Sequence, residues 1–209
     1  MDRKHALRAI AETGYNVGFG AKKHFATFDI VEKAPGWIGF VSMAVGIFAL
    51  VFDSLSAKTP SALLLIAGVV SLYIAFYRSS EYGEAGEKLT RIYNELRNLY
   101  FTVQSDQNSD ISSTMIKLKA LESEFYGASI SRQILFSDWY AHIKFFGQHQ
   151  HQWVNEQLQF QFWRDKVPAT FKIMIFVLVL AVLFASLVCY GFPQVLQNGL
   201  NYIFEYSTG

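Results

Sequence analysis

The chain has 209 residues, of which 52% are hydrophobic and only 17% are charged, and its mean hydropathy is +0.20. The 18 Lys and Arg residues nearly balance the 17 Asp and Glu residues, and the net charge of +1 argues against a nucleic-acid-binding protein. The single cysteine, Cys189, excludes a disulfide within the chain and a zinc site built from several cysteines. This composition favours a small membrane protein over a soluble domain.

Three long runs without a charged side chain decide the fold class. Residues 34–52 and 59–77 form runs of 19 residues each, and residues 173–192 form a run of 20. A helix of about 20 apolar residues crosses a hydrocarbon core of about 30 Å. In a soluble protein, three such helices would leave too little chain to cover them. The sequence therefore predicts an all-α membrane protein with three transmembrane helices in a lipid bilayer.

These runs divide the chain into five predicted segments. In chain order they are a cytoplasmic N-terminal helical segment (1–33), a transmembrane helical hairpin (34–77), a cytoplasmic helical domain (78–170), a third transmembrane helix (171–192) and an external tail (193–209). The glycine-containing stretch 14–23 is interpreted as a bend that precedes the membrane. The second span is expected to continue almost unbroken into the following helix.

The distribution of basic residues predicts the orientation. Residues 1–33 hold six Lys and Arg, residues 34–77 hold one, residues 78–172 hold eleven, and the rest of the chain holds none. Because cytoplasmic loops carry an excess of Lys and Arg, this alternation indicates three spans with the N-terminus in the cytoplasm. We expect a multi-pass protein of the inner (cytoplasmic) membrane.

One amphipathic helix dominates the predicted cytoplasmic domain. Apolar residues recur at spacings of three and four after residue 78, which indicates a helix with one apolar face. The stripe can pack within one chain or between chains. We interpret it as an oligomerisation stripe of a homo-oligomer, because a three-span chain cannot enclose a pore alone. Its residues are Leu89, Ile92, Leu96, Leu99 and Val103.

A second stripe, of small residues, lies on the second span. Ala67, Ser71 and Ala75 share one helix face, and Arg78 follows at the cytoplasmic end. Small residues let helices approach closely in lipid. We interpret these four positions as a pore lining, and packing against the first span is an equally open interpretation.

The sequence offers no constellation for catalysis. Of the five histidines, His149 and His151 point to different faces of a helix, and no cysteine near them completes a metal site. The stretch 14–23 lacks the spacing of a phosphate-binding loop. We therefore expect no enzyme activity, no metal site and no cofactor.

The stretch GFGAKKHFATFDIVEKAPGWIGFVSMAVGIFALVF, followed by a second span that leads into YRSSEYGEAGEKLTRIYNELRNLYF, resembles the SLATT family. These are two-transmembrane effector domains of bacterial conflict and nucleotide-signalling systems. The resemblance covers roughly residues 15–165, with the third span as an addition. It implies a pore-forming or membrane-disrupting effector of antiviral defence, signalled by a nucleotide or by a sensor protein encoded nearby. It supplies no catalytic residue.

Two functions therefore compete. In the first, the chain oligomerises and opens a pore, or disrupts the inner membrane, when its cytoplasmic helices receive a signal. In the second, it is a non-conducting, membrane-anchored scaffold that recruits a partner. An enzyme is the least favoured third possibility.

Overall fold

The computed structural model describes residues 2–106, 109–148 and 151–186. The chain divides into two compact units, residues 1–166 and residues 167–209. Within the described residues the secondary structure is entirely helical. The first unit contains α1 (Arg3–Phe48), η1 (Asp53–Leu55), α2 (Lys58–Ile74), α3 (Ser79–Ser105), α4 (Ile111–Ala128), α5 (Ser137–Gln148), α6 (Gln152–Leu158) and the short π-helical turn η2 (Phe162–Lys166). The second unit contains α7 (Ala169–Ser186).

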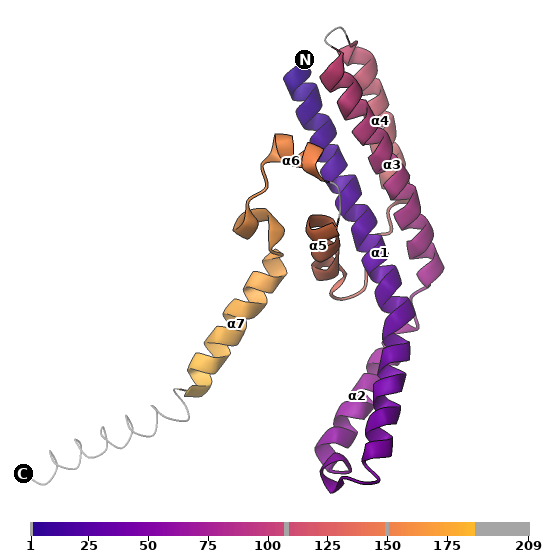
Figure 1. Ribbon diagram of the computed structural model, residues 1–209, viewed down its shortest axis with the longest axis vertical. Coiled ribbons are helices and arrows are strands. Elements are labelled where there is room, and N and C mark those ends of the chain that lie inside the picture. The colour runs from indigo at the N-terminus through magenta and orange to yellow at the C-terminus, as the bar shows by residue number, and fades with distance from the viewer. Residues whose placement is uncertain (1, 107–108, 149–150, 187–209) are drawn as a thin grey trace, which may run out of the picture. The chain divides into compact units, whose positions relative to one another are not determined.

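The central element is α1, which packs against α2, α3, α4, α5 and α6. It is one helix of 46 residues, about 69 Å long at 1.5 Å per residue. The Asp2 carboxylate caps its start by accepting a hydrogen bond from the His5 backbone at 2.8 Å. Figure 1 shows α1 running the length of the first unit, with α3 and α4 on one side and α5 and α6 on the other.

The expected bend at residues 14–23 is wrong, because α1 continues through it. The glycines serve close packing instead. A Cβ atom at Gly14 would lie 2.3 Å from the Trp153 ring, and one at Gly18 would lie 2.7 Å from the Tyr93 ring. Glycine therefore lets aromatic side chains of α6 and α3 reach the α1 backbone.

The first half of α1 forms the core of a helical bundle. Its buried side chains include Ile10 and Val17, which pack with Leu118 of α4 and Val154 of α6. The apolar face of α3 lies in the same core, so the predicted amphipathic helix is confirmed. The Asp110 side chain begins α4 by accepting from two backbone N–H groups of the first turn.

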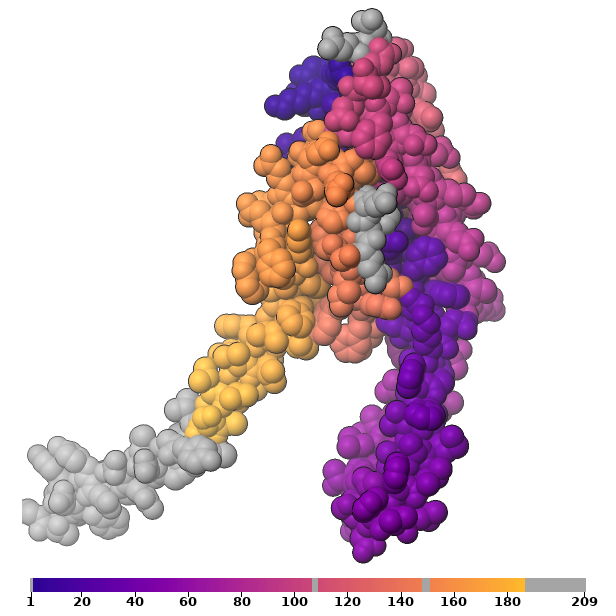
Figure 2. Space-filling model, viewed as in Figure 1, coloured from indigo at the N-terminus to yellow at the C-terminus, as the bar shows by residue number. Residues whose placement is uncertain are grey.

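The second half of α1 and α2 form an antiparallel hairpin that is apolar on its surface. Leu50, Val51 and Leu65 are 87%, 74% and 72% exposed, respectively. An apolar surface of this extent requires a non-aqueous covering. Figure 2 shows the hairpin projecting beyond the bundle on the face in view.

Two described helices, α1 and α7, are long and apolar enough to cross a membrane. The helices α2 and α3 would supply one more span if they counted as a single bent element, because their axes differ by 59° across a short break. The structure thus supports two to three spans.

The expectation that the second span continues almost unbroken is wrong. At the break α2 ends at Ile74, Tyr77 is buried, and Arg78 takes an extended backbone conformation as the residue before α3.

The second unit is described only through α7, which begins directly after Pro168. Lys172, in the first turn, is the one charged residue among the 18 of this helix, and none of the 18 is buried. The predicted end of the third span, residues 187–192, and the predicted external tail lie outside the described residues.

Candidate functional site: the junction between hairpin and bundle

Four segments of the first unit meet where the hairpin joins the bundle. They are the middle of α1, the break between α2 and α3, the loop of residues 129–136, and the start of α5. Ile74, Tyr77, Tyr82 and Ile134 form a buried cluster there, and Ile38 of α1 packs against it. We call this region the junction, and residues 129–136 the junction loop.

His24 fastens α1 to the junction loop. Its side chain is 3% exposed. The Nδ1 atom lies 2.7 Å from the Gly20 carbonyl oxygen, and Nε2 accepts a hydrogen bond from the Ile130 N–H at 2.9 Å. Because Nε2 accepts, Nδ1 carries the proton and the ring is neutral. Burial lowers the pKa of His24, the Gly20 carbonyl opposes this shift, and the Lys23 charge adds to it.

Further hydrogen bonds join the junction loop to α1 and to α3. The Thr27 hydroxyl of α1 donates to the Gln133 side chain at 2.6 Å. On the other side, the Tyr82 hydroxyl of α3 donates to the Arg132 carbonyl at 2.6 Å. The Arg132 guanidinium lies 4.7 Å from the centre of the Tyr77 ring, within the range of a cation–π interaction. The loop therefore links α1 with the break between α2 and α3.

Two ion-pair groups hold α5 on α1. The Asp29 carboxylate binds Lys33 on its own helix at 2.6 Å, and it also binds Lys144 of α5. Lys23 of α1 pairs with Asp138 of α5 at 2.7 Å. Burial acts to raise the pKa of Asp29, but hydrogen bonds from Lys144 and Lys33 outweigh it and lower the pKa. The carboxylate is thus ionised at neutral pH.

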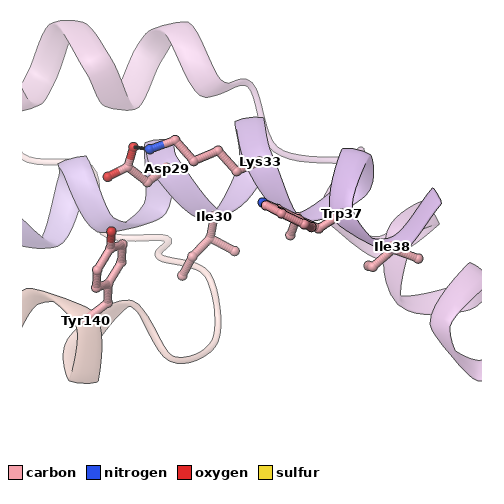
Figure 3. A pocket seen from close by; sticks show the side chains of 7 residues that line it. Asp29, Ile30, Lys33, Trp37, Ile38 and Tyr140 are labelled. Carbon is pink, nitrogen blue, oxygen red and sulfur yellow. Dashed lines mark hydrogen bonds and ion pairs between the residues drawn. The ribbon is translucent and has the colours of Figure 1, made fainter. Parts of the chain in front are cut away.

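A shallow groove of about 350 Å³ follows α1 from the junction toward the hairpin. Asp29, Lys33 and Tyr140 form its polar end, and Trp37 and Ile38 form its apolar end. Figure 3 shows Tyr140 facing α1 from α5, with Lys33 bridged to Asp29 and with Trp37 and Ile38 farther along the helix. The groove is amphipathic, and its residues do not form a nucleophile–base pair.

Among the described residues, no group of three or more His, Cys, Asp or Glu side chains could hold a metal ion. The histidines at 142 and 151 each lie among aromatic rings. His142 packs edge-on against Phe19, with ring centres 4.7 Å apart, and His151 lies 5.5 Å from the Phe145 ring. His149 lies outside the described residues.

The four positions interpreted as a pore lining do not share one environment. Ala67 and Ser71 are half-buried, on the same side of α2 as the buried Ile74. Ala75 and Arg78 are exposed, and Arg78 pairs with Glu81 of α3 at 3.1 Å. The arrangement of Ala67 and Ser71 fits packing against the rest of the hairpin in this conformation.

The stripe interpreted as an oligomer contact lies inside the chain's own bundle. Leu89, Leu96 and Val103 are 0% exposed, and Ile92 and Leu99 are buried with them. These side chains pack against α1 and α4. Of the two uses that the sequence allowed, burial within one chain is the one that this conformation displays.

Sequence reasoning missed the junction itself. Its main contacts join residues that are far apart along the chain: 106 positions separate His24 from Ile130 and Thr27 from Gln133. No periodicity marks such pairs. The only local signal is a polar break in an apolar stretch, Ser131 to Gln133, which indicates a loop but not its partners.

The sequence matches the SLATT_6 family, described as SMODS and SLOG-associating 2TM effector domain 6, over residues 1–175. The chain therefore belongs to this family, and the resemblance that the sequence suggested is confirmed. The match includes the hairpin and the bundle and ends within the first turns of α7. No curated protein and no solved structure matches the chain.

Proposed function

We propose, on the premise that the chain is a two-transmembrane effector domain, that it acts as the membrane-embedded effector of a bacterial anti-phage or conflict system. In this proposal the bundle receives a signal at the cytoplasmic face of the inner membrane. Copies of the chain then assemble as a homo-oligomer and open a pore or disrupt the membrane. The observation that carries the proposal is the continuity of α1, which is both the core of the bundle and one arm of the hairpin.

Continuity matters because no linker separates the two halves of α1, although Pro35 removes one backbone hydrogen bond between them. The first half of α1 is held by α3, α4, α5 and α6, and its second half is an arm of the exposed apolar hairpin. A rearrangement of the bundle therefore tilts or shifts the hairpin directly. Shear and hinge motions of packed helices are an established way to switch such elements.

The small-residue stripe of α2 remains our proposed pore lining. Ala67 and Ser71 are half-buried in the present conformation, so an open lumen requires that the two hairpin helices part or rotate. No charged residue lies in 34–52 or 59–77. A closed pore with such walls is a hydrophobic gate that opens by wetting, and Arg78 at its inner end would favour anions or slow cations.

The proposed orientation places the bundle in the cytoplasm, where the excess of Lys and Arg lies. There the bundle can meet a nucleotide signal or a sensor protein encoded nearby, the partners that the family implies. Subunit contacts are expected on the exposed hairpin surface rather than on the α3 stripe, since that stripe is covered within the chain.

A non-conducting scaffold is the second candidate. The observation that favours it is the uniformly apolar surface of the hairpin, on which Leu, Ile, Val and Phe side chains are exposed. Such a surface suits a lipid anchor as well as a gate. The two candidates differ in whether the membrane becomes permeable.

Inducible expression in bacteria with a membrane-potential dye separates the two. Depolarisation that precedes the loss of viability supports the effector. Growth arrest at an unchanged membrane potential refutes the pore and leaves the scaffold. Expression with and without the neighbouring sensor gene shows whether a signal is required.

A further inference from the structure

We propose that the end of the junction loop, Leu135 and Phe136, inserts into the interfacial region of the bilayer beside the hairpin. The partner is a lipid surface. This contact is separate from the spans and does not depend on whether they conduct. It would make the junction a third element of the unit, besides α1 and α2, that responds to the membrane.

The first observation is the way that the loop presents these two side chains. Leu135 is 66% exposed and Phe136 is 54% exposed, although Ile134 before them and Ser137 after them are buried. Phe136 has a φ angle of 67°, a left-handed backbone conformation that is costly for a bulky residue. The fold thus keeps Leu135 and Phe136 exposed, although the backbone of Phe136 is strained.

The second observation is the level of the loop along the hairpin. Ile134 packs in the cluster of Ile74 and Tyr77, at the end of α2 nearer the bundle, and Ile38 of α1 packs against the same cluster. Tyr73 and Tyr77 lie in the last turns of the apolar run, where aromatic residues gather at membrane interfaces. In Figure 1 the loop lies at the end of α5 nearer the hairpin. The outward side chains therefore continue the apolar surface of the hairpin at its inner end.

The third observation is the charge of the loop. Residues 129–137 contain one ionisable side chain, the exposed Arg132, and no carboxylate. The next acidic residue, Asp138, is paired with Lys23. A cation beside exposed apolar side chains suits the phosphate level of a bilayer, where basic side chains meet anionic headgroups.

Site-directed spin labelling tests this contact. The full chain, with Cys189→Ser to remove its cysteine, is reconstituted in phosphatidylethanolamine–phosphatidylglycerol vesicles. Labels are placed by Leu135→Cys and, separately, by Phe136→Cys. The matched control is Ile116→Cys, because Ile116 is a 72% exposed apolar residue of α4, about 18 Å of helix from the junction loop.

We expect the labels at 135 and 136 to collide with oxygen far more often than with a water-soluble nickel complex. Their ratio of the two collision rates should be several-fold above that of the Ile116 label. A ratio equal to the Ile116 control would place the loop in water and overturn the proposal. Shielding of both labels from both reagents would also overturn it, because it would indicate that a protein surface, such as a second copy, covers the loop.

Discussion

Replacing Gly14 with alanine tests the packing of α1 in the bundle. The added Cβ atom would lie 2.3 Å from Cη2 of Trp153, and ordinary contacts begin at 3.4 Å, so the indole must retreat by about 1 Å. Trp153 has little room to do so. It is 3% exposed, and the Tyr93 and Tyr100 rings have their centres 5.4 and 5.1 Å from its own.

The expected change in the free energy of unfolding combines two costs and one gain. Overpacking of a core costs about 1–3 kcal/mol. Movement of the indole also weakens the hydrogen bond that its N–H donates to the Tyr93 hydroxyl at 2.9 Å, which adds about 1 kcal/mol. That hydroxyl stays protonated, since burial raises the pKa of Tyr93 to about 12. Alanine recovers about 1 kcal/mol of helix propensity, so the net destabilisation is about 1–3 kcal/mol.

The assay is denaturant unfolding in mild detergent, followed by near-ultraviolet circular dichroism. The matched control is Gly127→Ala in α4, where the added Cβ would point into open space, and we expect it to be neutral or stabilising by up to about 1 kcal/mol. In a Trp153→Leu background, Gly14→Ala should cost less than in the native chain. A Gly14→Ala variant as stable as the Gly127→Ala control would refute this account of the bundle.

Four further predictions concern the junction, the α3 stripe and the hairpin. The free energy of unfolding should fall as the pH falls below about 6.5, because His24 binds a proton more readily in the unfolded chain than in the folded one, where its pKa is lowered. His24→Gln should reduce this pH dependence in denaturant unfolding measured over a pH series. Asp29→Asn removes the carboxylate that pairs with Lys144, and denaturant unfolding should show the free energy of unfolding lowered by about 1–3 kcal/mol. The control Glu95→Gln, on the exposed face of α3, should change it by less than about 0.5 kcal/mol. Leu96→Ala should destabilise the bundle by about 2–5 kcal/mol and leave the subunit number of the folded protein unchanged in light scattering; a smaller assembly would instead assign the stripe to a subunit contact. Ser71→Leu should abolish ion flux and toxicity at unchanged expression. Normal flux in this variant would place the lining on another span.

The elements that the sequence predicted well are those with a continuous local signal. The uncharged runs 34–52 and 59–77 mark the hairpin, because a helix that crosses a hydrocarbon core needs about 20 predominantly apolar residues. The apolar spacing from Leu89 to Val103 marks the buried face of α3 in the same way. Neither pattern says which surface covers the face, so the stripe could not be assigned to one chain or to two.

The two errors have different physical causes. Glycine permits both a bend and a close helix contact, and only the position of Trp153 and Tyr93 shows that Gly14 and Gly18 serve the second. No proline or glycine in the sequence marks the break after α2. It depends on Tyr77 turning inward to a cluster completed by Ile134, 57 residues later in the chain. Such long-range contacts are outside the reach of local patterns.

Ion flux from vesicles that contain the purified full chain tests the central proposal most directly. Insertion is first verified by protease accessibility, and flux is then measured over a series of protein-to-lipid ratios. If the hairpins assemble into a pore, flux should rise more steeply than in proportion to that ratio. Vesicles that hold the inserted chain and stay tight at every ratio would contradict the pore and favour a membrane-anchored scaffold.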